Sequence, residues 1–449
     1  MSEIKISSTG WLALYLENDN VLVFDLNDTS LWQCLEAESA IDDNSNDLHR
    51  NQIKFSPNGQ FLVVNRPNKH LYISIQSDYD KSGVYWLLKQ IIRAENSILA
   101  LTLTDEILLI GDSIGDIYKF NLLFNSSNED RILTAENNRI IRNSSMLLDI
   151  IFFRMSNKKS FVITADRENK ICLNDYLNIS DNLNYCFGHN QFVSHIKLID
   201  NNRILSASGD GTLRLWHVPD CMPLAFVHSK ALTLQAKQVF FTGLYALNNS
   251  ASLAANQKDV MPECIKKSSS TVNDSIWKMD VACSNPLISN VYIVFSTYAR
   301  RYHSIYLSSL SNMKQLNNEQ RELIFDPIYG GIIDYCFPAQ ETFLNDYTTH
   351  EKYFLYVLFN TNVLVQVDIL AMLSHNQTAL FVQANDRIQE INYILANNEF
   401  NLVHKRIKKD ALIFEELFEN STDSNNNCHR KRISETFEEQ ENRKKQALS

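Results

Sequence analysis

The stretch of sequence that decides the fold begins at Cys186, reads CFGHNQFVSHIKLIDNNRILSASGDGTLRLWHV, and ends at Val218. Three short β-prone segments (192–198, 203–208 and 212–218) are separated by residues typical of turns. Gly209 and Gly211 can adopt a positive φ angle, and the carboxylate of Asp210 can cap the turn between them. The pattern therefore predicts antiparallel strands joined by tight turns.

This unit resembles a WD repeat, with Gly188-His189 as the opening dipeptide and Trp216-His217 where that repeat has Trp-Asp. A single unit cannot bury both of its faces, so it predicts further copies around it. Weaker copies of the strand–turn–strand pattern occur at 51–75, 98–120 and 146–173, with a spacing close to the ~40–45 residues of the repeat.

The predicted fold class is all-β, a WD40-type β-propeller of seven blades over residues 1–372, with the clearest blades at 51–220. Eight blades remain an alternative. Strand candidates continue through 222–371, and Trp11 to Phe24 supplies a strand pair at the start, with the N-terminal strand closing the ring beside the last blade. Residues 373–449 are predicted to form a charged C-terminal extension, partly helical and partly disordered.

A hydrogen-bonded tetrad is predicted within the clearest blade, formed by His189, Ser208, Asp210 and Trp216, with Ser206 as the alternative hydroxyl. A carboxylate in a tight turn can orient an imidazole, which then meets a hydroxyl and an indole N–H. Because buried polar groups must be paired, this arrangement favours a structural role. The competing hypothesis, a hydrolytic triad of His189, Asp210 and Ser208, is disfavoured.

The sequence contains none of the common catalytic or cofactor-binding motifs. It lacks a G-x-G-x-x-G, a P-loop, a G-x-S-x-G and an H-E-x-x-H, and it has 11 glycines in all. The eight cysteines form no C-x-x-C pair, so no zinc or redox site is predicted. We therefore expect a protein that is not an enzyme and that holds no cofactor or metal itself. No apolar run approaches the ~20 residues of a membrane helix, and no secretory signal is recognised, so an intracellular chain without membrane contact is expected.

The net charge is −10, and residues 1–400 alone carry −11. Such an acidic body does not bind nucleic acid by bulk electrostatics, since that binding requires clustered cations. The basic runs 405–409 and 429–432 could be nuclear-localisation signals or ordinary solvated charge.

A dense polar cluster, Asp166-Arg167-Glu168-Asn169-Lys170, lies at a predicted turn between two strands. It could be a solvated hairpin tip or the edge at which a partner docks. The physical pattern by itself leaves both hypotheses open.

Several motifs occur in the order of one known family. They are Ser145-Met146-Leu147-Leu148-Asp149, Thr164-Ala165-Asp166-Arg167, Cys186-Phe187-Gly188-His189, Phe192-Val193-Ser194 and the segment Leu205 to Trp216. Together they resemble the non-catalytic WD-repeat subunit of the eukaryotic tRNA (guanine-N7-) methyltransferase, the Wuho-like family.

The resemblance implies a scaffold that binds and stabilises a separate S-adenosylmethionine-dependent subunit, as a heterodimer, for N7-methylation of a variable-loop guanosine in tRNA. It implies that S-adenosylmethionine is on the partner, that tRNA is contacted indirectly or slightly, and that the protein is nuclear and also cytoplasmic. The alternative function is a general protein-interaction scaffold, such as a substrate receptor or chromatin-associated adaptor.

The resemblance also implies a partner-binding set of residues: Asp166, Arg167, Glu168, Lys170 and Cys172. In this set Asp166 braces the turn and Lys170 reaches an acidic group of the partner. Cys172 stands where the family has a basic residue.

Overall fold

In the computed structural model, the described part of the chain is built mainly of β-strands. The described residues are 3–16, 19–36, 50–67, 69–77, 85–122, 132–135, 138–142, 145–155, 159–177, 183–200, 202–218, 220–242, 274–283, 291–309, 320–326, 329–339, 353–375, 379–381 and 386–397. The basic runs 405–409 and 429–432 lie outside them.

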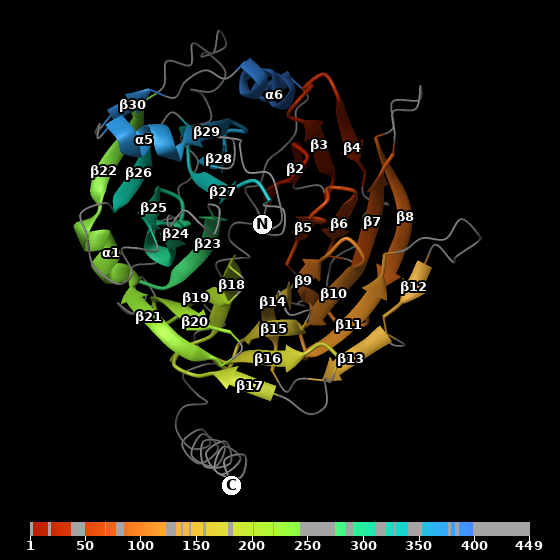
Figure 1. The fold of residues 1–449 in the computed structure, drawn as a ribbon. Coiled ribbons are helices and arrows are strands. Elements are labelled where there is room, and N and C mark those ends of the chain that lie inside the picture. Colours follow the sequence, from red (N-terminus) through yellow and green to blue (C-terminus); the bar gives the residue numbers. More distant parts are fainter. Residues whose placement is uncertain are drawn as a thin grey trace.

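Within this described part, the strands form seven sheets arranged as blades around a ring (Figure 1). Blade 1 contains β1 (Ile4–Ile6), β2 (Trp11–Tyr15), β3 (Val21–Asp25) and β4 (Trp32–Leu35). Blade 2 contains β5 (Gln52–Phe55), β6 (Phe61–Asn65), β7 (His70–Gln76), β8 (Trp86–Arg93) and the added β12 (Ile132–Thr134). Blade 3 contains β9 (Ile98–Leu103), β10 (Ile107–Asp112), β11 (Asp116–Asn121) and β13 (Arg139–Arg142). These are three of the seven blades.

The remaining blades follow in sequence order. Blade 4 contains β14 (Leu147–Arg154), β15 (Ser160–Asp166), β16 (Ile171–Asp175) and β17 (Leu183–Cys186). Blade 5 contains β18 (Val193–Asp200), β19 (Arg203–Ser208), β20 (Thr212–His217) and β21 (Met222–His228), and is followed by α1 (Ser229–Gln235). Blade 6 contains β23 (Ile276–Cys283), β24 (Val291–Thr297), the 3-10 turn η2 (Tyr298–Arg300), β25 (Ser304–Ser309), β26 (Arg321–Phe325), β22 (Lys237–Thr242) and β30 (Ala379–Phe381). Blade 7 contains β27 (Ile332–Cys336), β28 (Phe354–Phe359) and β29 (Leu364–Asp368), and α5 (Ile369–His375) and α6 (Asp386–Asn397) complete the described chain.

The seven-bladed propeller predicted from the sequence is therefore confirmed. The strands predicted downstream of residue 222, at 238–241, 291–296, 304–307, 331–337, 353–358 and 363–367, match β22, β24, β25, β27, β28 and β29. The sequence pattern missed β23 and β26, which complete blade 6.

Apolar clusters between neighbouring blades hold the ring together. Among the described residues, each of seven such clusters joins two adjacent blades, as where Trp11 of blade 1 packs with Phe55 and Trp86 of blade 2. Burying one large apolar side chain contributes about 1.5–3 kcal/mol, so each interface stabilises the ring substantially. Because packing is required between faces rather than at fixed motifs, blades of divergent sequence can still cohere.

In the part of the chain that the structure describes, the ring closes between blades 7 and 1 without exchange of a strand. The N-terminal strand β1 lies beside β27, as expected, but its ladder bonds go to β2 within its own blade. Blade 7 has three strands among the described residues, and α6 packs Ile388, Ile391 and Leu395 into the cluster shared by the two blades.

A side chain of α6 takes the place of a fourth strand in blade 7. The Asn392 amide donates to the carbonyl of Leu364 at 2.9 Å and accepts from its N–H at 2.8 Å. On the other side of the joint, Thr29 of blade 1 donates to Glu390. Thus β30 and α6, which lie in the predicted extension 373–449, are attached to the propeller, and the expected boundary after residue 372 falls inside α5.

The turns between the second and third strands of the blades share one backbone feature. In six blades this turn contains a residue with positive φ: Asp19, Lys69, Gly115, Asn169, Gly211 and Asn362. Since Gly, Asn and Asp tolerate the left-handed conformation best, these positions explain much of the turn composition seen in the sequence. Equivalent turns of successive blades lie on the same face of the ring, which places the polar turn of blade 4 beside those of blades 3 and 5.

Candidate functional site

The predicted docking turn connects β15 to β16 in blade 4. Asp166 braces this turn as expected: its Oδ1 accepts from the backbone N–H of Lys170 at 2.9 Å, and its own N–H donates to the Lys170 carbonyl at 3.1 Å. Asn169, at the end of this turn, has a φ of 63°. Asparagine suits that conformation better than most side chains, so its presence has a local backbone reason.

The exposed part of the turn is an ion pair. Lys170 Nζ lies 2.8 Å from Glu168 Oε2, and the two side chains are 28% and 40% exposed. Burial favours a lower pKa for Lys170, but the hydrogen bond to Glu168 and the nearby Asp166 raise it overall. Arg167 is half-buried, and its backbone N–H donates to Met146 at 3.0 Å. Glu168 and Lys170 therefore present opposite charges at the surface.

The carboxyl group of Asp166 is buried, which is unusual for an aspartate. Burial raises its pKa to about 7, although the N–H and the ammonium of Lys170 act in the opposite direction. Its side chain is thus an internal brace and not a surface contact.

One predicted member of the docking set requires correction. Cys172 is only 6% exposed, and its side chain packs inside blade 4, where burial raises the pKa of the thiol. It is the second residue of β16, where it pairs with Thr164 of β15 in the middle of the sheet. Cys172, like the buried Asp166, is therefore not available for direct contact with a partner, and the partner-binding role of Arg167, Glu168 and Lys170 stays a prediction.

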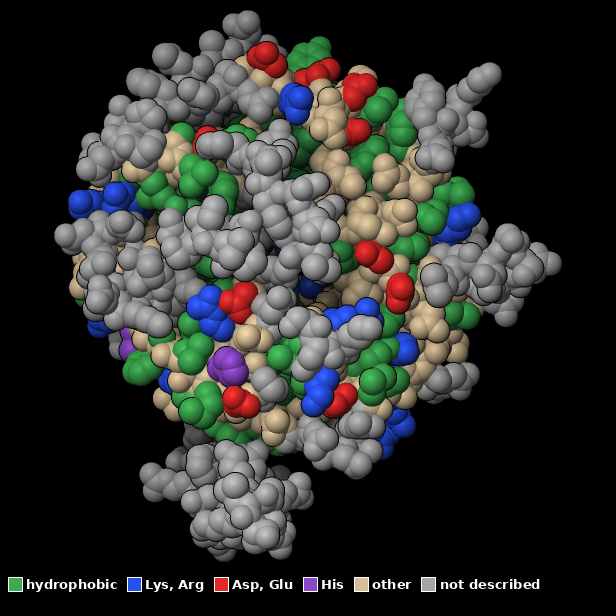
Figure 2. All heavy atoms as spheres, viewed as in Figure 1, with side chains coloured by type: hydrophobic (Ala, Val, Ile, Leu, Met, Phe, Trp, Pro, Cys, Tyr) green, Lys and Arg blue, Asp and Glu red, His purple; other side chains and the backbone are tan. Residues whose placement is uncertain are grey.

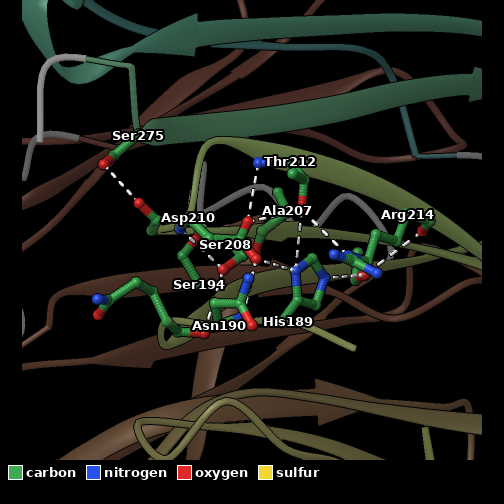
Figure 3. A network of polar contacts seen from close by, with 12 residues as sticks. His189, Asn190, Ser194, Ala207, Ser208, Asp210, Thr212, Arg214 and Ser275 are labelled. Carbon is green, nitrogen blue, oxygen red and sulfur yellow. Dashed lines mark hydrogen bonds and ion pairs between the residues drawn. The ribbon is translucent and has the colours of Figure 1, made fainter. Parts of the chain in front are cut away.

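A buried polar network braces blade 5 (Figure 3). His189 lies between Asp210, at 3.0 Å from Nδ1, and Ser206, at 2.7 Å from Nε2. Trp216 Nε1 donates to the same Ser206 oxygen at 2.8 Å. Thr212, which sequence reasoning did not include, donates to Asp210 Oδ1 at 2.6 Å.

The hydroxyl of the tetrad belongs to Ser206, so the choice of Ser208 was wrong. Ser208 Oγ instead donates to the carbonyl of Gln191 at 3.1 Å and accepts from the N–H of Asp210. Alternate residues of a strand face the same side, so the sequence pattern could not separate these two serines. The register decides: Ser206 pairs with Arg214 in mid-strand, whereas Ser208 pairs with Val193 at the end of β19.

The protonation of this network fits a structural role. Burial lowers the pKa of His189, so the ring is neutral at pH 7. Burial alone would raise the pKa of Asp210, but the bonds from His189 and Thr212 hold it below its ordinary value. Ser206 is fully buried, and Ser208 has no bond to His189, so the three groups of the hydrolytic hypothesis are not assembled.

Charged residues on the innermost strands were missed in the sequence. They include Lys5, Lys54, Lys278, Asp280 and Asp334, which lie near one another at the centre of the ring. The available signal was a lysine within a short apolar strand, as in Ile4-Lys5-Ile6 and Ile53-Lys54-Phe55. Among the described residues no group of His, Cys, Asp and Glu could hold a metal ion, and no described helix is long and apolar enough to cross a membrane.

Comparison with known proteins confirms the resemblance carried by the motifs. A family model described as the tRNA methyltransferase TRM82 WD40 domain matches residues 126–267, which include all of blades 4 and 5. Three curated relatives are named as non-catalytic subunits of tRNA (guanine-N(7)-)-methyltransferase: wdr4 of Dictyostelium discoideum (28% identical over 178 residues), wuho of Drosophila melanogaster (28% over 165) and WDR4 of Mus musculus (30% over 164).

These matches cover only part of each protein. The aligned segments span 36% of each of the three relatives and 36–37% of this chain. A chain in the crystal structure of the Mitotic Checkpoint Complex aligns over 81% of this chain and 85% of its own length, with 12% identity and a TM-score of 0.48. The fold assignment rests on the sheets described above.

Proposed function

We propose that this chain is the non-catalytic subunit of a tRNA (guanine-N7-) methyltransferase. In this role it binds and stabilises a separate catalytic subunit, which carries S-adenosylmethionine and methylates a variable-loop guanosine. The proposed assembly is a heterodimer, located in the nucleus and also in the cytoplasm.

One observation carries this proposal. The family match at 126–267 contains the whole β15–β16 turn, and the relatives that share this region are named as non-catalytic subunits. The region of strongest family likeness is therefore also the region that presents an exposed, oppositely charged pair.

The geometry of two neighbouring turns, β10–β11 of blade 3 and β15–β16 of blade 4, supports docking at the face of the ring that carries them. In blade 3, Asp112 accepts from the N–H groups of Ile114 and Gly115, in the way that Asp166 braces the turn of blade 4. Ile114 and Glu168 occupy equivalent turn positions, and Ile114 is 56% exposed. An apolar anchor beside a charged pair is a common composition for an interface centre with a polar rim.

The charge of the chain supports a division of labour between the subunits. With −11 over residues 1–400, the propeller does not attract RNA phosphates as a whole. We therefore expect the catalytic partner to supply most of the cationic surface for tRNA, with indirect or minor tRNA contacts here.

The docking turn is tested by reversing one charge. Lys170→Glu should weaken binding of the catalytic subunit roughly tenfold or more, because it replaces attraction by repulsion at a partly desolvated contact. Affinity is measured by calorimetry with the purified catalytic subunit. Lys89→Glu, at an exposed lysine on β8 of blade 2, is the matched control and should leave affinity unchanged.

A double variant separates docking from the stability of the turn. Exchanging the two charges (Glu168→Lys with Lys170→Glu) restores the pair within the turn but still presents the wrong charge to a partner. The proposal expects weak binding by this variant as well. Affinity equal to that of the unmodified chain would move the interface away from this turn.

A further inference from the structure

The innermost strands of the blades bring charged side chains together at the centre of the ring. Strands β1, β5, β9, β14, β18, β23 and β27 lie nearest the axis (Figure 1). Charged residues lie on or beside the inner strands of six of these blades. Contacts across the ring from Arg50 to Leu148 and His195, and the ion pairs Lys197–Asp280 and Lys278–Asp334 between neighbouring blades, place them around one channel.

Four carboxylates of this channel join neighbouring blades. Each accepts from a backbone N–H on the inner strand of the next blade or at its end. The four contacts are Glu3 to Ile53 (2.6 Å), Asp149 to Ile196 (2.9 Å), Asp280 to Phe337 (2.9 Å) and Asp334 to Ile4 (2.9 Å). Each of these carboxylates therefore already makes a hydrogen bond that links two neighbouring blades.

Three lysines pair with the same carboxylates. Lys5 lies 3.1 Å from Glu3 and Lys197 lies 2.9 Å from Asp280, while Lys278 pairs with Asp334. Each of these ammonium groups thus has a carboxylate partner inside the channel.

Lys54 on β5 is the exception. In the part of the chain that the structure describes, its ammonium group has no hydrogen bond and no ion pair. The reason lies in blade 3, whose inner strand β9 (Ile-Leu-Ala-Leu-Thr-Leu) offers no carboxylate to its neighbour. Burial lowers the pKa of Lys54 to about 8; Lys197 and Lys5 also lower it, and Asp149 and Glu3 counteract them.

One further basic group, Arg50 just before β5, reaches His195 on β18 across the ring. Arg50 donates to the carbonyl of Leu148 at 2.7 Å, and its second terminal nitrogen lies 3.4 Å from His195 Nε2. Burial, together with Arg50 and Lys197, keeps His195 neutral by lowering its pKa. Among the described residues of the channel, five basic side chains (Lys5, Arg50, Lys54, Lys197 and Lys278) therefore face four carboxylates (Glu3, Asp149, Asp280 and Asp334).

We propose that the channel beside Lys54, Lys197 and Arg50 binds a small phosphate-type oxyanion. Such an anion would supply the counter-charge that blade 3 lacks. The space-filling view shows a hollow near the ring centre, partly under grey atoms, with Lys and Arg side chains beside it (Figure 2).

The chemistry of the donors selects this class of ligand. A lysine ammonium group offers three N–H donors and a guanidinium offers five, and charge-assisted bonds to oxyanions are about twice as strong as neutral ones. A partly desolvated cation without a partner is costly, so a bound anion recovers free energy that the empty channel loses. The chain as a whole carries −10, so the excess positive charge is a local property of the channel.

The test measures anion binding by the full-length chain alone. Inorganic phosphate should raise the melting temperature saturably at millimolar concentration, beyond the effect of chloride at equal ionic strength. Titration calorimetry gives the affinity. Lys54→Met should weaken phosphate binding about tenfold or more, whereas Lys54→Arg should retain it. Lys89→Met, at an exposed position on β8 of the same blade, is the control and should bind as the unmodified chain does.

Two further arms complete the experiment. Adenosine monophosphate in place of phosphate shows whether the site takes the free ion or a phosphate carried on a larger molecule; binding of either supports the site. Sulfate, whose charge is constant, should bind more weakly as the pH rises past about 8 because Lys54 loses its proton there. Phosphate acting no more strongly than chloride, or a Lys54→Met variant with unchanged affinity, would overturn the proposal. Because no methyltransferase subunit is present, this result is independent of the proposed function.

Discussion

Ser206 shows what a single buried hydroxyl contributes to this propeller. It accepts from the Trp216 indole and, because His189 is neutral with Nδ1 directed to Asp210, it donates to Nε2. Removing it leaves two buried polar groups without their partner.

Replacement of this serine should be far more harmful than replacement of its neighbour. Ser206→Ala is expected to lower the free energy of unfolding by about 1–3 kcal/mol, the cost of unsatisfied buried groups. Ser208→Ala, which loses contacts to the backbone of Gln191 and Asp210, should cost less. Urea denaturation of the two variants measures the difference. Equal losses would show that Ser206 is not the central hydroxyl.

Asp166 makes stability depend on pH in an unusual direction for a carboxyl group. Its pKa is about 7 in the folded chain and about 4 in the unfolded chain, so the folded state binds the proton more tightly. Its contribution to stability is fully present below pH 4 and is lost as the pH rises to 7. Asp166→Asn removes this loss, so the stability of the variant relative to the unmodified chain should increase between pH 4 and 7. Denaturant unfolding across that range checks the sign, and a constant difference would contradict it.

At the scale of elements, sequence reasoning succeeded where a turn has special chemistry. Gly211 and Asn169 mark turns whose φ angles are positive, and the strands beside them were located correctly. It missed β23 and β26, because charged residues interrupt their apolar pattern: Lys278 and Asp280 lie within β23, and β26 begins with the buried Arg321 and Glu322. The Ser206–Ser208 choice and the burial of Cys172 depend on register and packing, which one sequence does not contain.

Helix α6 stabilises the junction between blades 7 and 1, and a substitution of Asn392 tests this role. Asn392→Ala leaves both the N–H and the carbonyl of Leu364 unpaired at the buried edge of blade 7, so we expect a loss of about 1–3 kcal/mol in unfolding free energy. Tyr393→Ala is the control on the same helix, since that side chain is 70% exposed, and it should change stability by less than about 0.5 kcal/mol. Hydrogen exchange should show faster opening of β29 in Asn392→Ala alone. Unchanged protection there would mean that α6 does not close the ring.

For the whole molecule, the fold and the proposed role have different origins. The propeller follows from apolar interfaces between seven blades, and alternating apolar strands with turn residues were enough to predict it. The proposed partner follows from a family likeness that covers 126–267, and the docking turn from the exposed charges within that range. The charged channel could not be predicted from the sequence, because its residues come from strands that are far apart along the chain.

The proposed role of this chain is to support catalysis by another subunit. Co-expression of the full-length chain with the cognate tRNA (guanine-N7-) methyltransferase subunit, followed by assay of N7-methylation on purified tRNA, tests this role. We expect the two proteins to co-purify in equal amounts and activity to fall strongly when this chain is omitted. Separate elution of the two proteins, together with undiminished methylation by the catalytic subunit alone, would contradict it.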